Sequence, residues 1–166
     1  MNNILISFIN IGPYHLARIK SANEHLKNQS FNLHILELTN NSLSHSWGDV
    51  DKSFTDKIST LVNLEKSQFS NESKDFSLPK VNVNLLNSYL DKIKPNLIFV
   101  PGWSFKLSRL LIKWANKNKV KTVLMSETKA NDKKRIFFIE FYKKLFLIPK
   151  FSAALVGGKS HANYLE

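Results

Sequence analysis

Glycine residues placed directly after short apolar segments are the first sign of chemistry in this sequence. The chain has only five glycines, and four of them follow segments typical of buried strands, namely Gly12, Gly102, Gly157 and Gly158. Glycine allows the backbone to approach a ligand closely or to adopt a positive φ. A turn between a strand and a helix also uses glycine without any ligand, so one such position decides little. The joint placement of all four, beside polar and aromatic residues, favours a ligand-binding edge.

A tyrosine, a histidine and an arginine follow the first of these glycines. Tyr14, His15 and Arg18 fall in the first turns of an expected helix that begins at Pro13. The N-terminus of a helix presents free N–H groups and partial positive charge, and it therefore favours anions. His15 and Arg18 are three residues apart and lie on adjoining helix faces, so they are candidates for a ligand-facing pair. A solvated helix start is the equally open alternative. The dinucleotide-binding pattern G-x-G-x-x-G is absent.

Two later segments that follow expected strands carry an indole, a hydroxyl, a carboxylate and an ammonium group. Trp103 and Ser104 follow Pro101-Gly102, and Glu127 and Lys129 follow an apolar segment that ends at Ser126. Trp103 is a candidate platform for a sugar or a lipid, although tryptophan more usually belongs to a core. Glu127 could bind hydroxyl groups or act as a base. Its alternatives are a solvated loop or a helix cap.

Other motifs exclude some chemistry. The sequence Gly-Gly-Lys-Ser at 157–160 resembles part of a phosphate-binding loop, but the position that such a loop requires to be glycine is Ala153. The order and spacing of serine, histidine and acidic residues suggest no catalytic triad, and no H-E-x-x-H or other metal-binding pattern is present. We therefore expect neither a resident metal nor a cofactor.

The elements that must position these residues alternate along the chain. Short apolar runs predict strands, and apolar residues at helical spacing predict helices. The expected strands are near 4–9, 31–38, 58–64, 97–100, 121–126 and 153–156, and the expected helices cover 13–27, 81–94, 105–118 and 134–148, with another opening at Lys159. Alternation of this kind predicts an α/β fold: a doubly wound, Rossmann-like, mainly parallel sheet with helices on both faces. Ligands bind such sheets at the carboxyl ends of the strands.

Length and composition are those of one globular domain. The chain has 166 residues, of which 43% are apolar, so disorder is not expected. Cysteine is absent, which excludes disulfides and thiolate zinc sites and fits a reducing cytosol. No apolar run approaches the ~20 residues that span a bilayer, and the start of the chain lacks the features of a signal peptide. A cytoplasmic location is the expectation.

Positive charge is concentrated in the second half of the chain. The formal net charge is +11, and the stretch from Lys106 to Lys150 holds thirteen basic and three acidic residues. Such a field attracts nucleic acid, anionic lipid or phosphorylated ligands. Nucleic acid is the least favoured of these, because no nucleic-acid-binding motif is present and the aromatic residues cluster among apolar ones.

One basic stretch is unusually rich in aromatic residues. The segment 133–150 contains ten large apolar residues that cover more than one helix face, together with six lysines and arginines. Helices of this composition lie on anionic bilayers, which makes peripheral membrane association an expectation. The alternative is an ordinary helix that packs on the sheet and has a basic outer face. In both cases some of the aromatic rings are expected to face the sheet.

Four segments occur in a characteristic order: ILISFINIGPYHLARI, LIFVPGWS, TVLMSET and SAALVGGKSHANYL. Together they resemble the amino-terminal half of a GT-B-type glycosyltransferase of the group-1, family-4-like bacterial kind. This resemblance implies that residues 1–166 form a single Rossmann-like domain that binds the sugar acceptor. A carboxy-terminal domain, absent from this sequence, would bind the nucleotide-sugar. The resemblance also implies that Gly157, Gly158, Lys159 and His161 lie at an interdomain cleft.

The activity implied by this resemblance is metal-independent, retaining transfer of a sugar from a nucleotide-sugar to a hydroxyl group, possible only when the donor domain is supplied. Many relatives carry a histidine after the fourth main strand, where this chain has Pro101-Gly102-Trp103, so His15 and Glu127 become the catalytic candidates. The expected acceptor-binding residues are Gly12, Tyr14, Arg18, Gly102, Trp103, Ser104 and Lys129. The alternatives are a non-catalytic acceptor- or partner-binding module, the remnant of a truncated gene, and, less favoured, a basic nucleic-acid-binding domain.

Overall fold

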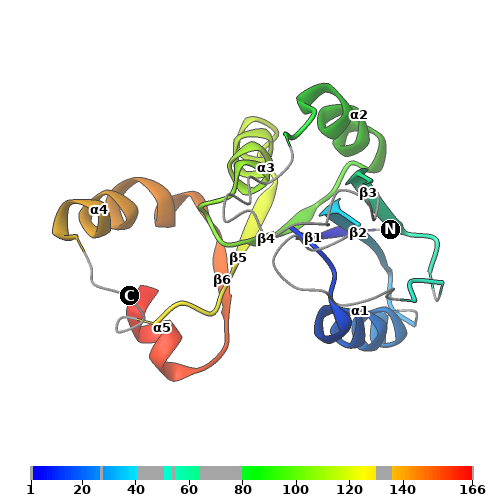
Figure 1. Cartoon of the computed structure of the whole chain (residues 1–166), viewed down its shortest axis with the longest axis horizontal. Helices are drawn as coiled ribbons and strands as arrows, with labels where there is room; N and C mark the ends of the chain where they lie inside the picture. The colour runs from blue at the N-terminus through cyan, green and yellow to red at the C-terminus, as the bar shows by residue number, and fades with distance from the viewer. Residues whose placement is uncertain are drawn as a thin grey trace, which may run out of the picture. The chain divides into compact units, whose positions relative to one another are not determined.

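The computed structural model describes residues 2–26, 28–40, 51–53, 55–63, 80–129 and 136–165. Most strands are followed by a helix. Within these described ranges six strands form one sheet, in the order β3 (Ile58–Val62), β2 (Phe31–Thr39), β1 (Asn2–Phe8), β4 (Leu97–Pro101), β5 (Lys121–Ser126) and β6 (Ala153–Val156). This is the Rossmann-like α/β fold expected from the sequence. The chain divides into two compact units, residues 1–96 and 97–166, whose helices and strands are labelled in Figure 1.

The first unit contains three parallel strands. They are β1 (Asn2–Phe8), β2 (Phe31–Thr39) and β3 (Ile58–Val62). In the register, Phe8 lies opposite Glu37, and Thr39 lies opposite Val62. The central strand β2 is buried along most of its length, which accounts for its nearly continuous apolar sequence.

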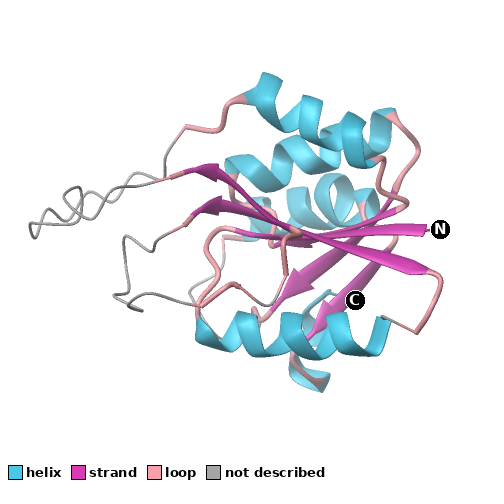
Figure 2. Ribbon diagram, turned by 90° about the vertical axis from the view of Figure 1, so that its right-hand side faces the viewer, coloured by secondary structure: helices cyan, strands magenta, loops and turns pink. Residues whose placement is uncertain are grey.

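Two helices cover this sheet on opposite faces. They are α1 (Pro13–Leu26) and α2 (Val83–Ile93), and Figure 2 shows helices on both sides of the strands. Helix α2 begins where the side chain of Asn82 accepts the N–H of Leu85, and it ends at Lys94, which adopts a left-handed conformation before Pro95. Fully buried leucines of α2, Leu86 and Leu90, form the core on its face.

The second unit also has three parallel strands, with one helix packed on two of them. The strands are β4 (Leu97–Pro101), β5 (Lys121–Ser126) and β6 (Ala153–Val156), and the helix is α3 (Lys106–Lys117). Helix α3 packs against β4 and β5 through Leu107, Leu111 and Ala115, which are all fully buried. The strand bounds lie within two residues of those expected from the sequence.

A second helical segment of this unit departs from expectation. It runs through α4 (Phe137–Tyr142), a π-helical turn (Lys143–Leu147) and a 3₁₀ turn (Ile148–Lys150), before β6 and α5 (Lys159–Leu165). We expected some aromatic rings of this segment to face the sheet, but none of its described residues is buried. The expectation was wrong because helical spacing reveals an apolar face but not what covers it. The basic residues at 133–135 lie outside the described residues.

No helix within the described ranges is both long enough and apolar enough to cross a bilayer.

Candidate functional site

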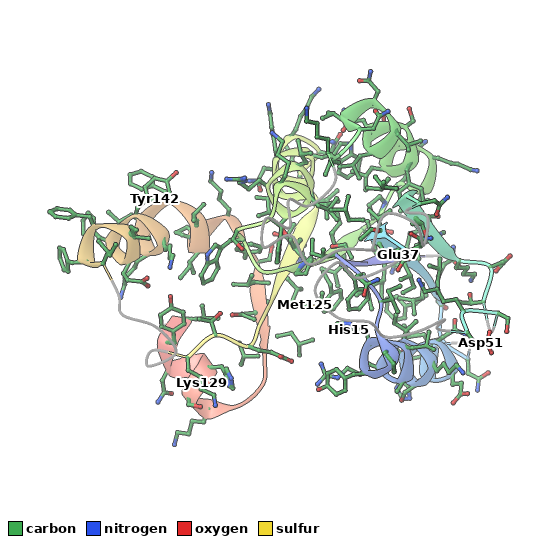
Figure 3. All side chains as sticks on the ribbon, viewed as in Figure 1. His15, Glu37, Asp51, Met125, Lys129 and Tyr142 are labelled. Carbon is green, nitrogen blue, oxygen red and sulfur yellow. The ribbon has the colours of Figure 1, made fainter. Side chains whose placement is uncertain are left out.

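The turn after β1 is held in place by a buried carboxylate. Glu37, in β2, is completely inaccessible to solvent, and its Oε2 accepts the backbone N–H of Ile11 at 3.3 Å. Gly12 follows, and its carbonyl oxygen accepts the N–H of Leu16, which is the first hydrogen bond of α1. The carboxylate thus fixes the glycine turn from which α1 begins. Figure 3 labels Glu37 and His15 in this unit.

Two further groups complete the environment of this carboxylate. The ammonium group of Lys52 lies 2.7 Å from Oε1 and 2.8 Å from Oε2 of Glu37. The hydroxyl of Thr60, in β3, donates to Oε1 at 2.7 Å. A charge buried in this way is stable only when it is paired and hydrogen-bonded, and both conditions are met here. Glu37 was not among the expected site residues, although a lone acidic residue in an apolar strand is a signal that the sequence contains.

The candidate residues on α1 contact aromatic rings. The guanidinium of Arg18 lies 4.0 Å from the ring centroid of Tyr14 and also donates a hydrogen bond to the Tyr14 hydroxyl. The half-buried ring of His15 lies 4.9 Å from the ring of Phe8. These contacts join Arg18 to Tyr14 and His15 to the end of β1. Tyr14 and Arg18 present an exposed aromatic and cationic surface on the first turns of α1.

In the second unit, the turn after β4 requires glycine. Gly102 has φ +62°, and its N–H donates to the carbonyl of Met125 at 3.0 Å. The buried hydroxyl of Ser108, in α3, donates to the carbonyl of Pro101 at 2.9 Å. These bonds tie the turn to both β5 and α3, so the backbone that leads into Trp103 has a defined path.

The three strand ends of this unit lie beside one another. Pro101 lies opposite Met125, and Ser126 lies opposite Val156, so the residues after β4, β5 and β6 reach the same edge. Ser104, Glu127 and Lys129 are exposed there, and the hydroxyl of Ser126 accepts the N–H of Thr128 at 3.3 Å. The strand pairing therefore places the segments that follow β4 and β5 at one sheet edge, and Figure 3 labels Lys129 in the segment after β5.

Trp103 stands beside a small charged cluster. The ammonium of Lys143 lies 5.3 Å from the centroid of the half-buried indole and 2.7 Å from Oε1 of Glu140. The hydroxyl of Tyr164, in α5, donates to Oε2 of Glu140 at 2.7 Å. A flat aromatic surface, a carboxylate, a phenol and an ammonium group are the side chains that bind sugar rings and their hydroxyls. Trp103 was expected from the sequence, whereas Lys143 over its ring, and Glu140 and Tyr164 bonded beyond that lysine, were not.

A histidine ring lies close to the glycine turn after β6. A Cβ atom placed on Gly157 would lie 3.3 Å from Cε1 of His161, and Gly158 has φ +150°. Both glycines and Lys159 are exposed, whereas His161 is half-buried. The expected cleft residues therefore form one compact turn, which caps the start of α5.

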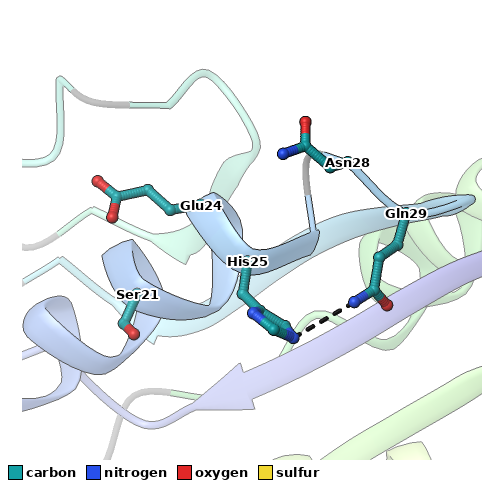
Figure 4. A pocket seen from close by; sticks show the side chains of 5 residues that line it. All are labelled: Ser21, Glu24, His25, Asn28 and Gln29. Carbon is teal, nitrogen blue, oxygen red and sulfur yellow. Dashed lines mark hydrogen bonds between the residues drawn. The ribbon is translucent and has the colours of Figure 1, made fainter.

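An open hollow of about 660 Å³ lies elsewhere, at the C-terminal end of α1. Its lining includes Ser21, Glu24, His25, Asn28 and Gln29, and the side chain of Gln29 lies 3.3 Å from Nε2 of His25 (Figure 4). This hollow is close to the start of β2, away from the carboxyl end of that strand. It contains none of the expected site residues. Among the described residues, no group of three or more histidine, aspartate and glutamate side chains could hold a metal ion.

Comparison with known proteins shows the fold. No family model matches the chain, and no curated protein sequence matches it. It is similar to a protein from Listeria monocytogenes named as a UDP-N-acetylglucosamine 2-epimerase, whose crystal structure at 2.2 Å resolution has a GT-B-like fold. The TM-score is 0.55 at 11% identity, over 98% of this chain and 40% of that one. The chain thus spans about two fifths of the length of this relative, and the likeness confirms the Rossmann-like fold.

A second solved structure is less similar. It is the N-terminal domain of the nisin resistance regulator NsrR, a lantibiotic response regulator, with a TM-score of 0.39 at 10% identity. That match covers 96% of this chain and 88% of the other. The score is too low to support any inference about this chain.

Proposed function

We propose that this chain is the acceptor-side domain of a GT-B-type glycosyltransferase of the group-1, family-4-like kind. It binds the molecule that receives a sugar, and a second Rossmann-like domain binds the nucleotide-sugar. The likeness to part of a protein named as a sugar-nucleotide enzyme supports this proposal, as does the ordered set of segments that resembles the family.

The observation that carries the proposal is the group of side chains around Trp103. An indole at the carboxyl end of β4 lies beside the hydrogen-bonded set of Glu140, Lys143 and Tyr164. A sugar ring presents an apolar face of C–H groups and a rim of hydroxyls. The indole matches the face, and the carboxylate, ammonium and phenol match the rim.

In the proposed reaction, an acceptor hydroxyl attacks the anomeric carbon of the donor sugar. A bond forms between the acceptor oxygen and that carbon, and the bond between that carbon and the phosphate oxygen of the nucleotide breaks. Glu127, exposed after β5, is the candidate in this unit to orient the hydroxyl or to take its proton. His15, at the start of α1, is the candidate in the other unit.

Calorimetry with methyl glycosides of glucose, galactose, mannose and N-acetylglucosamine tests the proposal. We expect at least one glycoside to bind, and we expect Trp103→Leu to weaken that binding by about tenfold, which corresponds to ~1.4 kcal/mol. Trp114→Leu is the matched control, because Trp114 is also a half-buried tryptophan of this unit but lies on α3. No binding to any glycoside, or equal loss in both variants, contradicts the proposal.

A further inference from the structure

The helical segment over residues 136–150 presents its aromatic side chains to solvent. The exposed fraction is 74% for Phe137 and 80% for Phe138, and it is about half or more for the other aromatic residues. We call these residues the aromatic face: Phe137, Phe138, Phe141, Tyr142 and Phe146. Their spacing places them on one side of a helix. In Figure 3, the ring of Tyr142 points away from α5.

The less exposed side of the same segment includes a charged pair that contacts the rest of its unit. Lys143 lies over the indole of Trp103, and Glu140 accepts the hydroxyl of Tyr164 from α5. The side chains of Lys143 and Glu140 are only 16% and 27% exposed. A helix on the surface of a protein in water normally has the reverse arrangement, with apolar residues inward and charged residues outward.

This inverted arrangement calls for an apolar surrounding on the outer side. Exposed aromatic residues that are contiguous mark sites where another surface binds. The aromatic face is accompanied by exposed lysines, Lys144 and Lys150, at the middle and the end of the segment. The stretch from Lys106 to Lys150 has thirteen basic and three acidic residues. The positive potential of this stretch favours binding to a negatively charged surface.

We propose that the aromatic face inserts into the interfacial region of an anionic lipid bilayer. Aromatic side chains seat at the boundary between headgroups and acyl chains, and lysines beside them attract anionic headgroups. Charge complementarity favours this occupant over a second copy of the chain, which would bring the same positive field to the contact. The proposal concerns a surface apart from the strand-end residues, so it does not depend on the sugar chemistry proposed above.

Flotation of the full 166-residue chain with lipid vesicles tests this proposal. We expect the chain to float with vesicles of equal parts phosphatidylcholine and phosphatidylglycerol, to bind little to pure phosphatidylcholine, and to be released by high salt. Phe137→Ser with Phe138→Ser should weaken binding by about tenfold or more, because the apolar insertion is lost. Lys144→Gln with Lys150→Gln should weaken it by about fivefold for each charge removed.

A matched control separates this surface from the overall charge. Lys113→Gln with Lys117→Gln removes two exposed lysines of α3, and it should change binding by no more than about twofold. Equal loss in the α3 variant overturns the proposal, as does the absence of binding to anionic vesicles. Sedimentation that shows a dimer abolished by Phe137→Ser with Phe138→Ser, without vesicle binding, overturns it in favour of self-association. Far-ultraviolet circular dichroism of each variant confirms that it is folded.

Discussion

The buried ion pair at the end of β2 gives a quantitative prediction about the turn that carries Gly12. Glu37 has no solvent exposure, and Lys52, Thr60 and the N–H of Ile11 all donate to its carboxylate. Lys52→Met keeps a side chain of similar length and removes the positive charge. It leaves the carboxylate inside the protein without its counter-ion.

The expected cost differs for each partner that is removed. Loss of the counter-ion of a buried charge lowers the free energy of unfolding by about 3–5 kcal/mol. Glu37→Gln removes the charge and replaces an accepting oxygen by a donor, and it should cost about 1.5–3 kcal/mol. Thr60→Val removes one hydroxyl and leaves the ion pair, so about 1 kcal/mol is expected. The double variant Glu37→Gln, Lys52→Met should cost less than the sum of its singles, because no unpaired carboxylate remains.

Urea unfolding followed by circular dichroism measures these differences in the free energy of unfolding. Thermal unfolding provides a check, because 1 kcal/mol corresponds to a change of about 2–4 °C in the melting temperature of a chain of this size. The expected order of loss is Lys52→Met, then Glu37→Gln, then Thr60→Val. A loss below about 1 kcal/mol for Lys52→Met, or strict additivity in the double variant, would refute the interpretation of Glu37 as a charge stabilised by Lys52.

Three other predictions concern the two units. Burial, assisted by the nearby charge of Lys57, lowers the pKa of His34, whose Nε2 lies 2.8 Å from the amide nitrogen of Asn32. The unfolded chain therefore binds a proton at this histidine more readily than the folded chain, so the free energy of unfolding should fall as the pH drops below about 6.5. Urea unfolding across that range should show a larger fall for the wild type than for His34→Gln. Gly102→Ala should lower the free energy of unfolding by about 1–2 kcal/mol, because Gly102 has φ +62°. Gly157→Ala should lower it less, because the His161 ring that an added Cβ would meet can move. Thermal unfolding of both variants tests this order. Glu140→Gln should increase amide hydrogen exchange in α5, because Tyr164 then donates to a neutral amide rather than to a carboxylate. Unchanged exchange would show that this hydrogen bond does not stabilise α5.

The fold was predictable because its strands are short apolar runs bounded by strong breakers. Strand β5 has the bounds expected from the sequence, and β4 differs by one residue at the proline before Gly102. The alternation of strands with helices then determines a parallel, doubly wound topology. These are local features, so they can be read without knowing which residues meet in space.

The contacts around the candidate site could not be predicted in the same way. Lys143 and Trp103 are forty residues apart, and nothing local to either indicates that the ammonium lies over the indole. The partners of Glu37 likewise come from segments 15 and 23 residues away. The segment at 136–150 shows the same limit, because the period of its aromatic residues defines a face but not the direction in which that face points.

The most direct test of the proposed function is a nuclear magnetic resonance titration of the isotopically labelled chain. We expect methyl glycosides to shift the backbone amides of residues 102–104 and 127–129, which include Trp103 and Glu127 and follow the neighbouring strands β4 and β5. UDP-N-acetylglucosamine should cause no shift beyond that of its sugar, because the proposed donor-binding residues belong to another domain. Shifts caused by the nucleotide with none from the glycosides would contradict an acceptor-side domain, as would glycoside shifts confined to the hollow lined by Ser21 and Gln29.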